Sequence, residues 1–142
     1  YVQKDPANWW YPKAMQYVRS CTSPSQRILA LPFIPIFYYL TDRPFGGGQM
    51  FLAPGYFSNR SDQIKMVKTM SNEDISVVID LPGFEYDGRE DRKVKSYAPI
   101  VFDYLNQNFT QIGRFGPAVV KVRREQVPVV SSNKAIGVPC PR

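Results

Sequence analysis

The chain has 142 residues, of which 44% are hydrophobic and 14% aromatic. This length and composition are typical of one globular domain and exclude a mainly disordered chain. The net charge of +6 favours anionic partners, although a solvated basic surface without a ligand is an equally open interpretation. Because the sequence contains no His, it has no Ser-His or Cys-His nucleophile pair, and we expect no catalytic centre within it.

The first half of the chain predicts a helix, a buried strand and a short helix. Residues 8–21 predict a helix, since apolar side chains recur at spacings of four, three and four. The continuous apolar run 27–31 predicts a strand buried on both sides. Residues 35–43 predict a short helix that starts with Pro, and the glycine run 46–48 predicts a flexible loop. A brief strand is expected at 51–53.

A second main helix is expected to begin after Ser61, whose side chain suits an N-cap. Ile64, Val67 and Met70 would then form its buried face. The β-branched, apolar run 75–81 is the clearest predicted strand.

The rest of the chain predicts an exposed charged loop at 85–95 and a helix at 97–109. A hairpin over 112–123 is expected to turn near Gly116. Residues 126–142 contain few large side chains and predict a loosely ordered tail.

These elements indicate an α/β fold, in a single domain over residues 1–125 followed by the tail. We expect a small layered sandwich with a mainly parallel sheet, helices on both faces and an antiparallel C-terminal hairpin. Because the chain begins at Tyr1 and not at Met, we expect it to be a domain of a larger protein.

The two cysteines, Cys21 and Cys140, leave two interpretations open. They form a disulfide that ties the tail to the first helix, or they remain two partly buried thiols. No metal-ligand spacing is present, and the glycine run lacks the P-loop pattern. We therefore expect no metal and no cofactor.

Candidate binding residues lie where aromatic and basic side chains alternate: Tyr39, Arg43, Tyr56 and Arg60. Aromatic rings stack on sugars or bases, and an Arg fork holds a phosphate in a bidentate way. The plainer interpretation makes Tyr39 a core residue and Arg43 a cap at a helix C-terminus. No nucleic-acid-binding signature accompanies these residues, so no nucleic-acid partner is expected.

The same segment carries a family resemblance. The runs "ILALPFIPIFYYLTDRPFGGGQMFLAPGY", "DQIKMVKTM" and "ISVVIDLP", with the later "YAPIVFDYLNQNFTQIGRFGPAVVKVR", resemble the soluble C-terminal domain of polytopic GT-C membrane glycosyltransferases. These include the dolichyl-phosphate-mannose–protein mannosyltransferases and bacterial lipid-linked sugar transferases. The resemblance covers about residues 9–124.

The resemblance implies a domain on the extracytoplasmic, periplasmic side of a membrane, beside the membrane-spanning part of the same polypeptide. The catalytic carboxylates would lie in an early loop of that part, so the chain itself would be a non-catalytic accessory domain. The donor would be a sugar on a polyprenyl phosphate. Arg43 would contact phosphate, with Tyr39 and Tyr56 as sugar or lipid platforms, and replacing Arg43 with Ala would lower transfer without unfolding the domain.

Two other classes of function stay open. A free-standing α/β binding module for an anionic small molecule or a partner protein would require no membrane-spanning region in the parent protein. An autonomous enzyme is disfavoured by the missing His and by the lack of a nucleophile motif.

Overall fold

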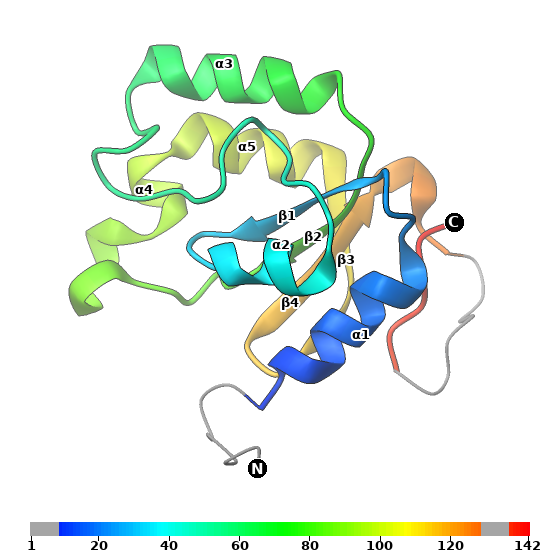
Figure 1. Cartoon of the computed structure of the whole chain (residues 1–142). Coiled ribbons are helices and arrows are strands. Elements are labelled where there is room, and N and C mark those ends of the chain that lie inside the picture. The colour runs from blue at the N-terminus through cyan, green and yellow to red at the C-terminus, as the bar shows by residue number, and fades with distance from the viewer. Residues whose placement is uncertain (1–8, 129–136) are drawn as a thin grey trace.

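The computed structural model, shown in Figure 1, describes residues 9–128 and 137–142. One mixed sheet has the strand order β1-β2-β4-β3. The strands are β1 (Arg27–Leu31), β2 (Ile75–Asp80), β3 (Phe109–Phe115) and β4 (Ala118–Arg123). The α/β class is therefore confirmed. The parallel-dominant sheet is not, because only β1 and β2 pair in parallel, while β2–β4 and β3–β4 are antiparallel.

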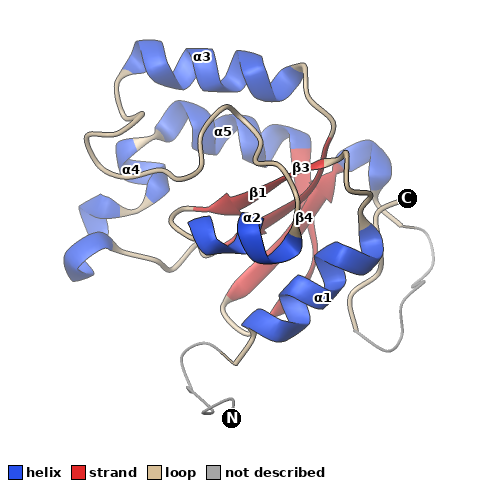
Figure 2. Cartoon of the chain, viewed as in Figure 1, coloured by secondary structure: helices blue, strands red, loops and turns tan. Residues whose placement is uncertain are grey.

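Helix α1 (Tyr11–Cys21) precedes β1, two helices lie between β1 and β2, and two more precede the β3–β4 hairpin (Figure 2). The other helices are α2 (Pro35–Thr41), α3 (Arg60–Ser71), α4 (Val94–Tyr97) and α5 (Pro99–Asn108). Short 3-10 turns occur at Tyr86–Gly88, Glu90–Arg92 and Arg124–Gln126. Within the described residues, every helix is too short or too polar to cross a bilayer.

Two apolar clusters lie on opposite faces of the sheet, because successive side chains of a strand point to opposite sides. Ile28 and Ala30 of β1 pack with residues of α1 and α2. Leu29 and Leu31 pack instead with residues of α3 and α5. The continuous apolar run that predicted β1 is explained by this burial on both faces.

The outer edge of β1 is covered by the segment that follows α2. The amide of Ile28 donates to Pro44, and the amide of Gly46 donates back to Ile28 at 2.8 Å. The hydroxyl of Tyr38 accepts a hydrogen bond from the Ala30 amide, also at 2.8 Å. These contacts satisfy backbone groups that an edge strand would otherwise expose, and they fix α2 beside β1.

The glycine run at 46–48 packs against α3, which corrects the expectation of a flexible loop. A Cβ on Gly47 would lie 2.9 Å from the Met66 side chain, and φ at Gly47 is +71°. Its amide donates to the Glu73 carboxylate at 2.7 Å. Only glycine combines this close approach with a left-handed backbone.

Helix α3 corrects two further expectations. Its N-cap is Asn59, not Ser61, and the Asn59 carbonyl oxygen accepts from the Asp62 amide at 2.8 Å. The predicted face was correct at Met70, which is buried, and Val67 is partly buried against the same cluster. It was wrong at Ile64, which is 47% exposed, and it missed the buried Gln63 and Met66. The expected strand at 51–53 is likewise absent from the described chain, where Ala53 and Tyr56 form only an isolated bridge.

The charged stretch is exposed as expected at residues 87–91 and 95, whereas residues 85, 86 and 92–94 are partly buried. It contains short helical turns that lead into α4. Helix α5 and the hairpin agree closely with their predicted positions. The hairpin turns at Gly116, which has a φ of +55° and where a Cβ would lie 2.9 Å from the Trp9 ring.

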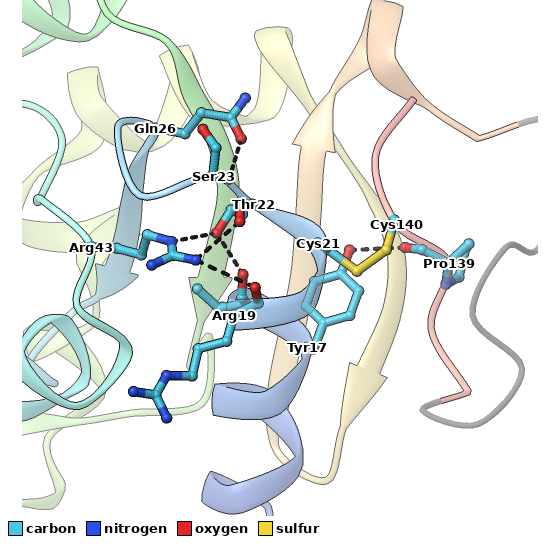
Figure 3. The surroundings of a disulfide bond; sticks show 10 residues. Tyr17, Arg19, Cys21, Thr22, Ser23, Gln26, Arg43, Pro139 and Cys140 are labelled. Carbon is cyan, nitrogen blue, oxygen red and sulfur yellow. Dashed lines mark hydrogen bonds between the residues drawn. A yellow bond between two sulfur atoms is a disulfide. The ribbon is translucent and has the colours of Figure 1, made fainter.

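The end of the chain returns to α1 (Figure 3). Cys21 and Cys140 form a disulfide, which resolves the two interpretations of the cysteines. The Tyr17 hydroxyl donates to the Pro139 carbonyl at 2.8 Å, and Val138 is buried in the cluster beneath α1. Residues 137–142 are thus anchored, whereas the section of the predicted tail at 129–136 lies outside the described residues.

Candidate functional site

The carboxyl ends of the parallel strands β1 and β2 lie at the same edge of the sheet, which we call the carboxyl edge. The two ends are joined by a hydrogen bond from the Leu81 amide to the Leu31 carbonyl at 3.0 Å. Two depressions flank residues 81–84, which follow β2. Ligands of open α/β sheets commonly bind outside the carboxyl ends of the strands. The carboxyl edge is therefore a candidate position for a ligand-binding site.

The depression on the α5 side is a cavity of ≈ 190 Å³, which we call the basic pocket. Asp80 and Lys121 come from the sheet, while Lys93 and Lys95 come from the end of the charged stretch and from α4. Its other walls include Asn106 of α5 and the ring of Phe84. The pocket therefore combines three ammonium groups, a carboxylate, an amide and an aromatic wall.

The base of the basic pocket holds an ion pair between Lys121 and Asp80. The Lys121 Nζ lies 3.0 Å from the Asp80 Oδ2, and the two side chains are 16% and 13% exposed. The alternation of β2 places Asp80 on the same face as Val78, toward the cluster under α5. Two charges thus lie on an otherwise apolar face of the sheet, where removing them from water is costly.

Lys93 and Lys95 form the outer wall of the pocket and share one carboxylate. The two oxygens of Glu90 lie 2.8 Å from the Lys93 Nζ and 3.7 Å from the Lys95 Nζ. Glu85 lies 3.3 Å from the same Lys93 Nζ. Hydrogen bonds to Glu90 and then Glu85 raise the pKa of Lys93, and the bond to Lys93 is the main cause that lowers the pKa of Glu90. The ammonium group of Lys93 is therefore held charged.

Two tyrosines, Tyr86 and Tyr97, lie beside each other, with ring centroids 6.3 Å apart. The Tyr86 hydroxyl donates to the Leu52 carbonyl at 2.5 Å, and burial raises the pKa of Tyr86 to about 12. The Tyr97 hydroxyl is buried without a hydrogen-bond partner among the described residues. Burial raises the pKa of Tyr97, and the charge of Asp80 adds to that shift. A buried, unpartnered hydroxyl needs an explanation, because most such groups are paired.

The depression on the α1 side is an apolar groove of ≈ 440 Å³ lined by Trp10, Phe33, Phe84 and Pro117 among others. A row of aromatic rings extends from it. Phe33 meets Phe51 edge-on at 5.0 Å between centroids, and Phe51 stacks on Tyr56 at 5.4 Å. Phe33 and Tyr56 remain 46% and 55% exposed, so the row presents apolar surface to solvent.

The predicted site residues Tyr39 and Arg43 line another depression, along α2. Tyr39 is 84% exposed, so the alternative that it is a core residue was wrong. All the N–H groups of Arg43 are engaged within the protein. Figure 3 shows those that reach Thr22 and Arg19. The N–H groups donate to Thr22, Thr41, Asp42 and Arg19, mostly to backbone carbonyls at the ends of α1 and α2. This is the capping role that the plainer interpretation described.

The other two predicted residues occupy separate positions. Tyr56 belongs to the aromatic row, and Arg60 is the exposed first residue of α3. The structure therefore brings Tyr39 and Arg43 to one depression and places Tyr56 in the row that extends from the apolar groove. It does not gather the four residues around one cavity.

The sequence analysis missed Asp80, Lys93 and Lys121. A signal for Asp80 was present, because a carboxylate closes the apolar run "ISVVID" and shares the two-residue alternation of Val78. Lys121 interrupts the valines of β4 in the same way. No local pattern predicts that these two side chains face each other, since that depends on the β2–β4 pairing.

Comparisons with family models, curated proteins and solved structures find no match to this chain. Among the described residues, no group of three or more His, Cys, Asp or Glu side chains could hold a metal ion.

Proposed function

We propose that this chain is a non-catalytic accessory domain of a membrane glycosyltransferase that uses a polyprenyl-phosphate-linked sugar. The domain would lie on the extracytoplasmic side, next to the membrane-spanning part of the same polypeptide, and help to form or cover the substrate site. The resemblance of the segments around α2, β2 and α5 to GT-C enzymes supplies the chemistry in this proposal.

The observation that carries the docking role is an exposed apolar surface on α2 and the segments beside it, which we call the docking surface. It consists of Phe33, Ile36, Tyr39, Leu40, Met50 and Tyr56, each at least 38% exposed. Large exposed apolar patches mark protein or membrane contacts. Three of the six are aromatic, and aromatic side chains are enriched at protein interfaces and at membrane–water boundaries.

The disulfide supports the extracytoplasmic location. Disulfides persist in oxidising compartments and are rare in the cytosol of most organisms. Cys21 and Cys140 are joined across 119 positions of sequence, and the bond closes the chain end onto α1.

The decisive test is to sequence the parent reading frame on both sides of this segment. We expect eight or more apolar spans of about 20 residues each, with paired acidic residues in an early extracytoplasmic loop. A parent protein without such spans would contradict the proposal.

The basic pocket favours a second candidate, a free-standing binding module for a small anionic molecule. In that case the docking surface would meet a soluble partner protein. The same reading frame separates the two candidates, because only the accessory domain requires membrane spans in the parent chain.

A further inference from the structure

We infer that the basic pocket is a binding site for a sugar phosphate, with Glu90 occupying the place of the phosphate in the ligand-free protein. The site stands on the pocket's own geometry. Only the source of the ligand, lipid-linked or free, rests on the proposed function.

The size and position of the basic pocket suit a small ligand. Its ≈ 190 Å³ is below the roughly 300–1,000 Å³ of pockets that hold drug-sized ligands, so it suits a small ligand or a headgroup. It opens at the carboxyl edge of the parallel pair, where α/β proteins commonly bind ligands.

The ion pair between Lys121 and Asp80 lies at the base of the basic pocket. Replacing a buried ion pair with well-packed apolar residues is often neutral or stabilising. Lys121 and Asp80 are therefore poorly explained by stability alone, and they line an accessible cavity. An ammonium and a carboxylate at the base of a pocket are suited to a ligand that carries hydroxyl groups, because the carboxylate accepts from a hydroxyl and the ammonium donates to it.

Glu90 is the carboxylate that pairs with both lysines of the outer wall. Its two carboxylate oxygens bridge Lys93 and Lys95, as two oxygens of a phosphate would. The Glu90 side chain is 66% exposed and sits on a 3-10 turn, so rotation into solvent costs it little. A phosphate bound at this outer wall would displace Glu90 and take both ammonium groups.

The basic pocket is also lined by an uncharged polar side chain and by aromatic rings. The Asn106 amide lines the pocket. Phe84 and Phe102 supply aromatic walls, and apolar walls with a few placed polar groups are typical of ligand sites. Together they suit a sugar ring better than a bare anion.

The test is an NMR titration of the full chain with inorganic phosphate, with glucose and with glucose 1-phosphate. We expect glucose 1-phosphate to bind most tightly and to shift the amide signals of residues 80, 81, 83, 84, 93–97, 106 and 121. Shifts located elsewhere, no shifts at millimolar ligand, or equal affinity for inorganic phosphate and glucose 1-phosphate would overturn the assignment.

Three variants test the role of Glu90. Glu90→Gln should bind glucose 1-phosphate about threefold to tenfold more tightly, and Lys93→Gln combined with Lys95→Gln should weaken binding by about tenfold or more, the effect of ~1.4 kcal/mol. Lys65→Gln combined with Lys68→Gln removes the same charge from the exposed face of α3 and should leave the affinity unchanged. Equal weakening by both double variants, or unchanged binding by Glu90→Gln, would contradict the inference.

The source of the ligand is tested with vesicles that contain or lack a polyprenyl-phosphate sugar. Tighter binding to the vesicles that contain it identifies a lipid headgroup as the ligand, whereas equal binding to both identifies a free sugar phosphate. A parent protein without membrane spans would remove the accessory-domain proposal and leave the result of the titration intact, so the two failures are distinguishable.

Discussion

The guanidinium of Arg43 joins the ends of two helices, since its donors reach Thr22 and Arg19 at the end of α1 and Thr41 and Asp42 at the end of α2. The sequence analysis expected Arg43→Ala to lower transfer with the fold intact. The hydrogen bonds now lead us to expect a loss of about 2 kcal/mol in the free energy of unfolding, because bonds from a charged donor are the stronger ones. Urea denaturation followed by circular dichroism measures it.

Arg19→Ala is the matched control, because only the Arg19 backbone carbonyl takes part in that network. It should change the free energy of unfolding by less than about 0.5 kcal/mol. Arg43→Lys should recover little, since an ammonium group lacks the planar fork. Equal midpoints for Arg43→Ala and the unchanged protein would contradict the structural role.

A second prediction at the residue scale concerns the ion pair between Asp80 and Lys121. Lys121→Met should lower the free energy of unfolding by about 3 kcal/mol, because it leaves a carboxylate unpaired on the inner face of the sheet. Asp80→Leu combined with Lys121→Met should recover most of that loss while abolishing glucose 1-phosphate binding. Thermal unfolding and the titration measure the two effects. A double variant less stable than Lys121→Met alone would show that the pair is needed for folding.

At the scale of elements, the sequence predicts what depends on local pattern. The prediction of the strand Arg27–Leu31 was correct to the residue. Turn residues bound its five consecutive positions, and nearly all of these positions are buried. The predicted cap of α3 was wrong because Asn59 and Ser61 are both good caps. The predicted face missed Gln63, because Gln63 is buried by its bonds to other segments. Its side chain donates to the Ser58 carbonyl and accepts from the Ile100 amide, 37 positions away.

The candidate site was harder to predict for the same reason. Arg43, Tyr39 and Tyr56 were chosen because they lie close together in sequence. The basic pocket unites β2, β4, α4 and α5, and its central pair, Asp80 and Lys121, is 41 positions apart. Nothing in a local pattern specifies the strand order that brings β4 next to β2.

The cap of α3 can be tested directly. Asn59→Ala should lower the free energy of unfolding by about 1 kcal/mol, because it removes the acceptor of the Asp62 amide at the start of the helix. Ser61→Ala, two positions along, should be nearly neutral since Ser61 is not the cap. Equal effects of the two substitutions in urea denaturation would contradict Asn59 as the cap.

The docking surface on α2 has a matched control on α3. Ile36 and Ile64 are both exposed isoleucines on the outer faces of helices, at 55% and 47%. We expect Ile36→Glu and Ile64→Glu to leave the free energy of unfolding within about 0.5 kcal/mol, since neither side chain is buried. If the chain is the accessory domain proposed above, only Ile36→Glu should reduce sugar transfer by the parent protein. Equal transfer by the two variants would remove α2 from the docking surface.

At the scale of the whole molecule, the chain end closes the layer that α1 forms on the sheet. Val138 fills space that a Cβ on Gly113 of β3 would enter, with only 2.9 Å between that Cβ and the Val138 side chain. Tyr17 holds the Pro139 carbonyl, and the Arg142 amide donates to the Gln126 carbonyl at 2.8 Å. The last residues therefore contribute to the core of a sheet whose strands all precede them by 14 positions or more.

The disulfide should consequently stabilise the whole domain. Cys21→Ala combined with Cys140→Ala should lower the free energy of unfolding by about 2–4 kcal/mol, because the bond spans 119 positions and restricts the unfolded chain. A thiol reductant should lower the stability of the unchanged protein by a similar amount and leave the double variant unaffected. Thermal unfolding with and without reductant, with hydrogen exchange at Val138, measures both effects. If reductant destabilised the double variant equally, the loss would come from the reagent and not from the bond between α1 and the chain end.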